Sequence, residues 1–115
     1  MGLSTHILDT HLGRPAANVS IQLFEFRDNA AGGGWHCVGS GFTDSDGRCK
    51  TLLGGHTLAA TDYKLRFDVG AYFHDLRIPT IYPYVEIVVR ITDPSQHYHI
   101  PLLLTANGYT TYRGS

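Results

Sequence analysis

The sequence is poor in cysteine, in charge and in long apolar runs, and each shortage excludes a class of protein. Its 115 residues contain only two cysteines, Cys37 and Cys49. They provide neither a disulfide framework nor a paired Cys-x-x-Cys metal motif, so we expect two reduced thiols. Nine Lys and Arg against ten Asp and Glu leave a net charge of −1, which gives no basic footprint for nucleic acid. The expected partner is therefore a small molecule or another protein, and not a nucleic acid.

Targeting and membrane signals are also lacking. Residues 1–6 have neither the basic start nor the apolar run of a secretion signal. Nowhere does the chain approach the roughly 20 consecutive apolar residues that a membrane span needs. These features predict a cytoplasmic protein without a membrane partner. A chain of this length can bury roughly two thirds of its unfolded surface in one core, so we expect a single domain over residues 1–115.

What the sequence does contain is alternation of apolar and polar residues, the pattern of half-buried strands. It predicts strands at 3–9, 19–26, 35–43, 62–69, 85–91 and 97–104. Only residues 70–76 favour a helical turn. With further short strands, one of them beginning at Arg48, the total is about seven or eight strands separated by turns, which predicts an all-β protein, an antiparallel β-sandwich. Phosphate-binding loops, nucleophile elbows and zinc-peptidase motifs do not occur in the sequence.

Four connections carry local signals. The Asp-Ser-Asp-Gly run at 44–47 predicts a turn that places Arg48 at the start of a short strand, without the ligand spacing of a calcium loop. Asn107 and Gly108 predict a positive-φ turn, followed by a polar tail. Pro15 is expected in a connection, and the three glycines at 32–34 predict a mobile hairpin loop.

The last nineteen residues hold the most unusual chemistry of the chain. His97 and His99 flank Tyr98 on a predicted strand and share the face turned away from the core. Two imidazoles on one face can converge on a ligand or a metal. A zinc site would need a third ligand, which His6 could supply if the first and the penultimate long strands are neighbours. Arg48 is either a solvated hairpin charge or a guanidinium that binds ligand oxygens. The other histidines are interpreted as structural: His11, His36, His56 and His74.

Together these segments resemble one family along essentially the whole chain, the transthyretin-related 5-hydroxyisourate hydrolases. The terminal Tyr-Arg-Gly-Ser at 112–115 is the most specific match, because in that family it distinguishes the hydrolases from the hormone-carrying transthyretins. The other matching blocks follow in order: residues 3–9, 13–16, 46–48, 67–73 and 97–104.

The resemblance implies a transthyretin-like sandwich of two four-stranded sheets with one short helix. It also implies a homotetramer built from two dimers, with active sites in the channel between the dimers. The site residues carried over from the family are three catalytic residues and a substrate-binding tail: His6, Arg48 and His99, then Tyr112, Arg113, Gly114 and Ser115.

The implied reaction is hydrolytic opening of 5-hydroxyisourate to 2-oxo-4-hydroxy-4-carboxy-5-ureidoimidazoline in urate breakdown. In this hypothesis His6 and His99 position and deprotonate water, while Arg48 holds the substrate oxygens, and no metal or other cofactor takes part. The main alternative is a carrier that binds a flat aromatic ligand in the same channel without hydrolysis. A zinc-binding module built on His97 and His99 is the second alternative.

Overall fold

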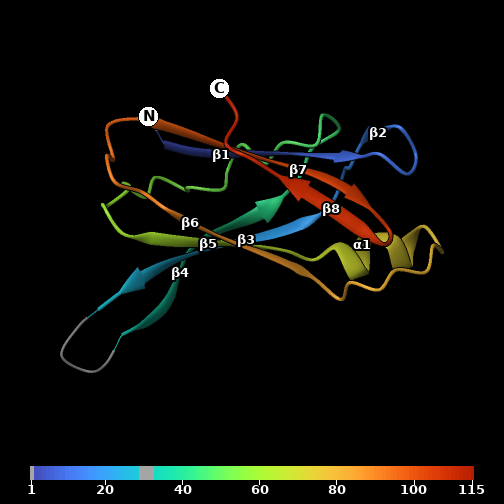
Figure 1. Ribbon diagram of the computed structural model, residues 1–115, viewed down its shortest axis with the longest axis horizontal. Coiled ribbons are helices and arrows are strands. Elements are labelled where there is room, and N and C mark those ends of the chain that lie inside the picture. The colour runs from blue at the N-terminus through green and yellow to red at the C-terminus, as the bar shows by residue number, and fades with distance from the viewer. Residues whose placement is uncertain (1, 29–32) are drawn as a thin grey trace.

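Two four-stranded sheets pack face to face in the computed structural model, which describes residues 2–28 and 33–115 (Figure 1). The first sheet has the strand order β2-β1-β7-β8 and the second the order β4-β3-β5-β6. The strands of the first sheet are β1 (Gly2–Asp9), β2 (Arg14–Pro15), β7 (His97–Thr105) and β8 (Gly108–Thr111). Those of the second are β3 (Ser20–Arg27), β4 (Gly34–Phe42), β5 (Asp62–Phe67) and β6 (Val85–Arg90). The predicted two-sheet sandwich is confirmed.

One strand pair differs from the antiparallel arrangement that the sequence predicted. β1 and β7 run parallel over eight residues of each strand, from Gly2 opposite His97 to Asp9 opposite Leu104. A parallel pair requires a long crossover, and here the whole second sheet lies between the two strands in the chain. The other strand pairs of the described residues are antiparallel. The parallel pair forms the centre of the first sheet and holds the histidines discussed below.

The core lies between the sheets, where the alternation of each strand places its apolar residues. Ile7, Leu23, Leu65 and Leu102 are completely buried. Thr5 also faces inward, and its hydroxyl donates to the carbonyl of Ile100 at 2.6 Å, so this buried polar group is paired. The opposite, outward faces of β1 and β7 are consequently free to carry polar side chains.

A short helix, α1 (Val69–Asp75), closes one end of the sandwich between β5 and β6 (Figure 1). Its buried residues are Val69, Tyr72 and Phe73, and the Tyr72 hydroxyl donates to buried Asp9 Oδ2 at 2.6 Å. The helix begins one residue before the predicted position. It is too short to cross a membrane, and no other helix occurs in the described ranges.

Three local predictions need correction. Neither Asn107 nor Gly108 has a positive φ, and the two turn residues are Ala106, which is buried, and Asn107. The residues predicted as a polar tail begin with an edge strand, β8, and Pro15 belongs to the two-residue edge strand β2. Edge strands tolerate proline because one of their sides needs no amide donors.

Arg48 also differs from its predicted place, since it forms an isolated bridge with His6 and does not begin a strand. The predicted mobile loop at 32–34 falls partly on residues 29–32, which lie outside the described residues.

Candidate functional site

The parallel register of β1 and β7 places a row of polar side chains on the outward face of the first sheet. Ser4 lies opposite His99, and Gly2 lies opposite His97. Leu3, Thr5 and Ile7 face the core, so Ser4 and His6 face outward with His99. His6 and His99 are half-buried and His97 is exposed. The condition set by the sequence, that the first and the penultimate long strands be neighbours, is met.

Arg48 reaches this face through the turn that precedes it. The amides of Asp46 and Arg48 donate to Asp44 Oδ1 at 2.9 and 3.1 Å. Both hydrogen bonds lower the pKa of Asp44, and the bond from Arg48 has the larger effect. Gly47 has a φ of 77°, and a Cβ there would come within 2.4 Å of the Ile7 carbonyl oxygen. That close approach lets the Ile7 amide donate to Gly47 O at 2.8 Å. The glycine thereby fixes Arg48 beside His6.

The chain returns to the same place at residue 114. The amide of Gly114 donates to the carbonyl of His99 at 2.7 Å. A Cβ at position 114 would lie 2.6 Å from Cδ2 of the His99 ring, closer than side chains approach one another. Gly114 therefore lies directly against the imidazole, and exposed Ser115 follows it.

The two histidines of β7 are joined by a serine that the sequence analysis did not select. Ser4 Oγ lies 2.9 Å from Nε2 of His97 and 2.8 Å from Nδ1 of His99. The alternation of residues 3–9 did place Ser4 on the face of His6. Only the register between β1 and β7 brings its hydroxyl between two rings, and that register has no signal in a single sequence.

The surroundings of His99 favour its neutral form over the imidazolium. Burial lowers the pKa of His99 below its usual value, and the positive charge of Arg48 and the neighbouring His6 and His97 lower it further. A neutral imidazole can accept a proton, whereas an imidazolium cannot. No buried side-chain nitrogen or oxygen in the described residues lacks a partner. Since Nε2 of His99 has no hydrogen-bond partner among them, this atom is open to solvent.

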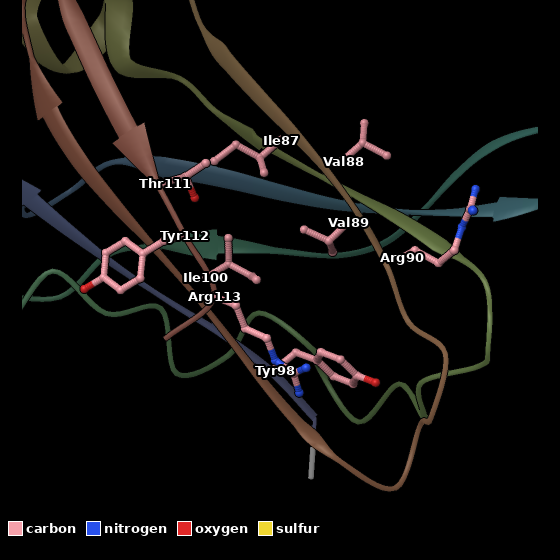
Figure 2. Close-up of a pocket in the computed structure, with 9 residues that line it drawn as sticks. All are labelled: Ile87, Val88, Val89, Arg90, Tyr98, Ile100, Thr111, Tyr112 and Arg113. Carbon is pink, nitrogen blue, oxygen red and sulfur yellow. The ribbon is translucent and has the colours of Figure 1, made fainter. Parts of the chain in front are cut away.

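Two of the predicted tail residues have side chains elsewhere. Tyr112 and Arg113 line a cavity of about 280 Å³ at the edge of the sandwich, between β6 and the β7–β8 side of the first sheet (Figure 2). The guanidinium of Arg113 stacks over Tyr98, 4.5 Å from its ring centroid, and Nη2 donates to Gln96 Oε1 at 2.9 Å. Figure 2 shows the Arg113 side chain beside Tyr98, with Tyr112 directed away from it. His6, Arg48 and His99 do not line this cavity.

A metal site on this face would need a third ligand beside His97 and His99. The described residues contain no group of three or more His, Cys, Asp or Glu placed to hold a metal ion. His97 and His99 direct one ring nitrogen each at Ser4, and Arg48 would place a positive charge beside a bound cation. The residues present therefore suit an uncharged or anionic ligand better than a metal.

A β-sandwich of this topology with imidazoles, a guanidinium and a returning tail on one outward face defines a transthyretin-like protein with a polar site. The comparisons with known proteins agree. The HIUase/Transthyretin family model matches residues 3–114, and the chain belongs to that family.

Three similar proteins illustrate the range of the family. The 5-hydroxyisourate hydrolase of Salmonella typhimurium is 42% identical over 113 residues, which are 98% of this chain and 80% of that protein. The crystal structure of transthyretin from Sparus aurata has a TM-score of 0.87 at 29% identity, covering 97% and 95% of the two chains. The structure of Klebsiella pneumoniae 5-hydroxyisourate hydrolase has a TM-score of 0.80 at 30% identity, covering 98% and 92%.

Proposed function

We propose that this protein hydrolyses 5-hydroxyisourate, opening its ring to give 2-oxo-4-hydroxy-4-carboxy-5-ureidoimidazoline in urate breakdown. The observation that carries the proposal is the convergence of His6, Arg48 and His99 on one outward face. Relatives about 42% identical over 98% of the chain are hydrolases of this substrate. Both lines of support point to acyl chemistry with water as the nucleophile.

The catalytic roles proposed for His99, His6 and Arg48 follow from the charge of each side chain. His99, neutral and open at Nε2, removes a proton from water as it attacks the ring carbonyl, and His6 helps to position that water. General-base catalysis of this kind contributes roughly 10²- to 10⁴-fold in rate. Arg48 binds the substrate oxygens and the oxyanion that develops on the attacked carbonyl, where a fixed positive charge stabilises the transition state more than the ground state.

The tail residues and the assembly of several chains would complete the site. We propose that Tyr112, Arg113, Gly114 and Ser115 form the substrate-binding wall in the assembled protein. Within one chain Gly114 contacts His99, and the side chains of Tyr112 and Arg113 line the edge cavity. We propose a homotetramer of two dimers, because the site face is open in one chain. Strands β6 and β8 are edge strands of their sheets and both contribute to the lining of this cavity, where Val88 and Tyr112 are exposed. Unpaired sheet edges favour pairing with another chain. Two free cysteines fit a reducing compartment, which supports the cytoplasm.

The test is the decay of freshly generated 5-hydroxyisourate, followed by ultraviolet absorbance with and without the purified protein. We expect rapid decay with the wild-type protein and large losses in the His99→Ala and Arg48→Ala variants. The His36→Ala variant is the control, because His36 lies on β4 in the other sheet. Decay at the spontaneous rate, with folded wild-type protein, would exclude the function.

The carrier function is the second candidate, and the similarity to Sparus aurata transthyretin favours it. An apolar aromatic ligand would bury His6, Arg48 and His99 without hydrogen-bond partners, which is costly. Calorimetric titration with a thyroid-hormone-like aromatic decides between the two: tight binding without hydrolytic activity would establish the carrier.

A further inference from the structure

The hydroxyl of Ser4 contacts two imidazoles, and this contact restricts where their protons can be. A serine hydroxyl has a single proton to donate. Its Oγ lies within hydrogen-bond distance of His97 Nε2, at 2.9 Å, and of His99 Nδ1, at 2.8 Å. If Ser4 donates to one ring, its oxygen is free to accept an N–H from the other. One histidine then presents the lone pair of its ring nitrogen to Ser4, and the other presents an N–H.

We propose that Ser4 and His97 form a proton relay that sets the tautomer of His99 and connects it to solvent. This inference rests on the proposed function, in which His99 is the base. In the resting state Nδ1–H of His99 donates to Ser4 Oγ, and the Ser4 hydroxyl donates to Nε2 of His97. His99 Nε2 then carries the lone pair that removes a proton from water. Ser4 and His97 are positioning residues, since neither needs to touch the substrate.

The relay conserves the number of protons on its three residues over one turnover. When Nε2 of His99 takes a proton from water, the Nδ1 proton moves to Ser4 Oγ and the serine proton moves to Nε2 of His97. Exposed His97 releases its Nδ1 proton to solvent, and both imidazoles are neutral again. When His99 later gives its Nε2 proton to the departing ring nitrogen, Ser4 returns a proton to Nδ1. His97 then returns one to Ser4 and recovers its own from solvent.

The surroundings of His99 favour removal of this extra charge. The positively charged or titratable groups that face it are Arg48 from the turn, His6 from β1 and His97 from its own strand. Gly114, which covers part of its ring, is neutral. A second positive charge on His99 beside Arg48 is therefore unfavourable, whereas the same charge on exposed His97 is solvated. The relay transfers the charge from the first place to the second.

The tautomers can be measured without activity. In ¹⁵N-labelled wild-type protein at alkaline pH, imidazole nitrogen shifts should show His99 protonated at Nδ1 and His97 likewise at Nδ1. Ser4→Ala should give mixed tautomers of His99, whereas Ser4→Thr, which keeps the hydroxyl, should retain the wild-type pattern. His99 protonated mainly at Nε2 in the wild-type protein, or unchanged in Ser4→Ala, would overturn the relay.

Kinetics supply the second readout. We expect Ser4→Ala and His97→Ala to lower kcat by about tenfold or more, part of what general acid–base catalysis contributes, with little change in KM. Added imidazole should partly rescue His97→Ala, and Ser4→Thr should remain near wild type. Ser40→Ala, a serine of β4 in the other sheet, is the matched control. Full activity in Ser4→Ala would refute the relay and leave the hydrolase intact. An inactive wild-type protein would refute the proposed function and the catalytic role of the relay, and the tautomer measurement would still test the hydrogen bonds at Ser4.

Discussion

Gly114 lies against the imidazole of His99 so closely that no side chain fits between them. Its amide donates to the His99 carbonyl at 2.7 Å, and a Cβ would be 2.6 Å from the ring atom Cδ2. The contact joins the last residues of the chain to the centre of the first sheet. It explains in steric terms why a glycine occupies this position in a stretch of the chain that is otherwise exposed.

Gly114→Ala is predicted to damage activity more than stability. The added methyl must displace either the tail or the His99 ring, and such overpacking costs about 1–3 kcal/mol. The tail is the exposed partner and moves at less cost, so we expect a folded protein with strongly reduced kcat. The measurements are hydroxyisourate decay and thermal unfolding. Gly108→Ala is the control, because its Cβ would make only an ordinary contact 3.5 Å from Thr105 Oγ1. Equal effects of the two variants would contradict the prediction.

The pH profile should reveal the charge that Arg48 places beside His99. Burial and the Arg48 charge both lower the pKa of His99, so the wild-type enzyme keeps its base unprotonated to a lower pH. Arg48→Gln removes the charge, raises the His99 pKa, and moves the acidic limb of kcat/KM toward higher pH. The limb is measured in the residual activity of the variant, with His36→Gln as the control. A limb that stays in place or moves to lower pH would show that His99 is not the group that titrates.

The fold was predictable because its signals are local, and the site was only partly so. Alternation within 62–69 and 85–91 identifies strands β5 and β6 without reference to any neighbour. The outward position of His6 and His99 follows from the same period of two. The adjacency and parallel direction of β1 and β7 do not follow from this alternation, since the pairing of distant segments depends on the whole core.

The same limit explains the individual errors. Ser4 was overlooked because its importance comes from the register with β7, which places it opposite His99. The stacking of Arg113 on Tyr98 likewise depends on how the returning tail lies beside β7, which the alternation of a single strand does not indicate. Asn107 and Gly108 often form a positive-φ turn, but the burial of Ala106 sets this hairpin one residue earlier.

Acid should destabilise the protein through Glu25, a buried carboxylate of β3 in the second sheet. Burial alone would raise its pKa, but hydrogen bonds from Tyr63, Arg27 and His56 outweigh burial and lower the pKa to about 2. A carboxylate with a depressed pKa contributes stability that is complete above its unfolded value of about 4.5 and is lost as pH falls toward 2. The contribution is about 3 kcal/mol.

Urea unfolding at fixed protein concentration from pH 6 to pH 2.5 measures this loss. Glu25→Gln should be less stable at pH 6, since the amide cannot accept all of these bonds and leaves Arg27 and His56 without their anion. It should also lose less stability than wild type between pH 4.5 and 2.5. Parallel pH dependences of the two proteins would contradict the assignment. Glu86→Gln is the control, because Glu86 is a half-exposed strand residue whose ion pairs contribute little.

Arg77 offers a stabilising substitution at the end of α1. It has a φ of 58°, the left-handed conformation in which a side chain costs roughly 1–2 kcal/mol. The amide of Arg77 donates to His74 O and that of Ile78 to Phe73 O, both at 2.9 Å, the bonding that normally has glycine at this position. Arg77→Gly removes the strain but gives the unfolded chain more freedom, worth about 0.5–1 kcal/mol. The expected net gain is up to about 1 kcal/mol, or a few degrees in Tm.

Asn18→Gly, at a φ of 62°, should gain less, because asparagine tolerates this conformation. Thermal unfolding of both variants at one protein concentration tests the order, and an Arg77→Gly protein less stable than wild type would show that the arginine side chain makes contacts worth more than its strain.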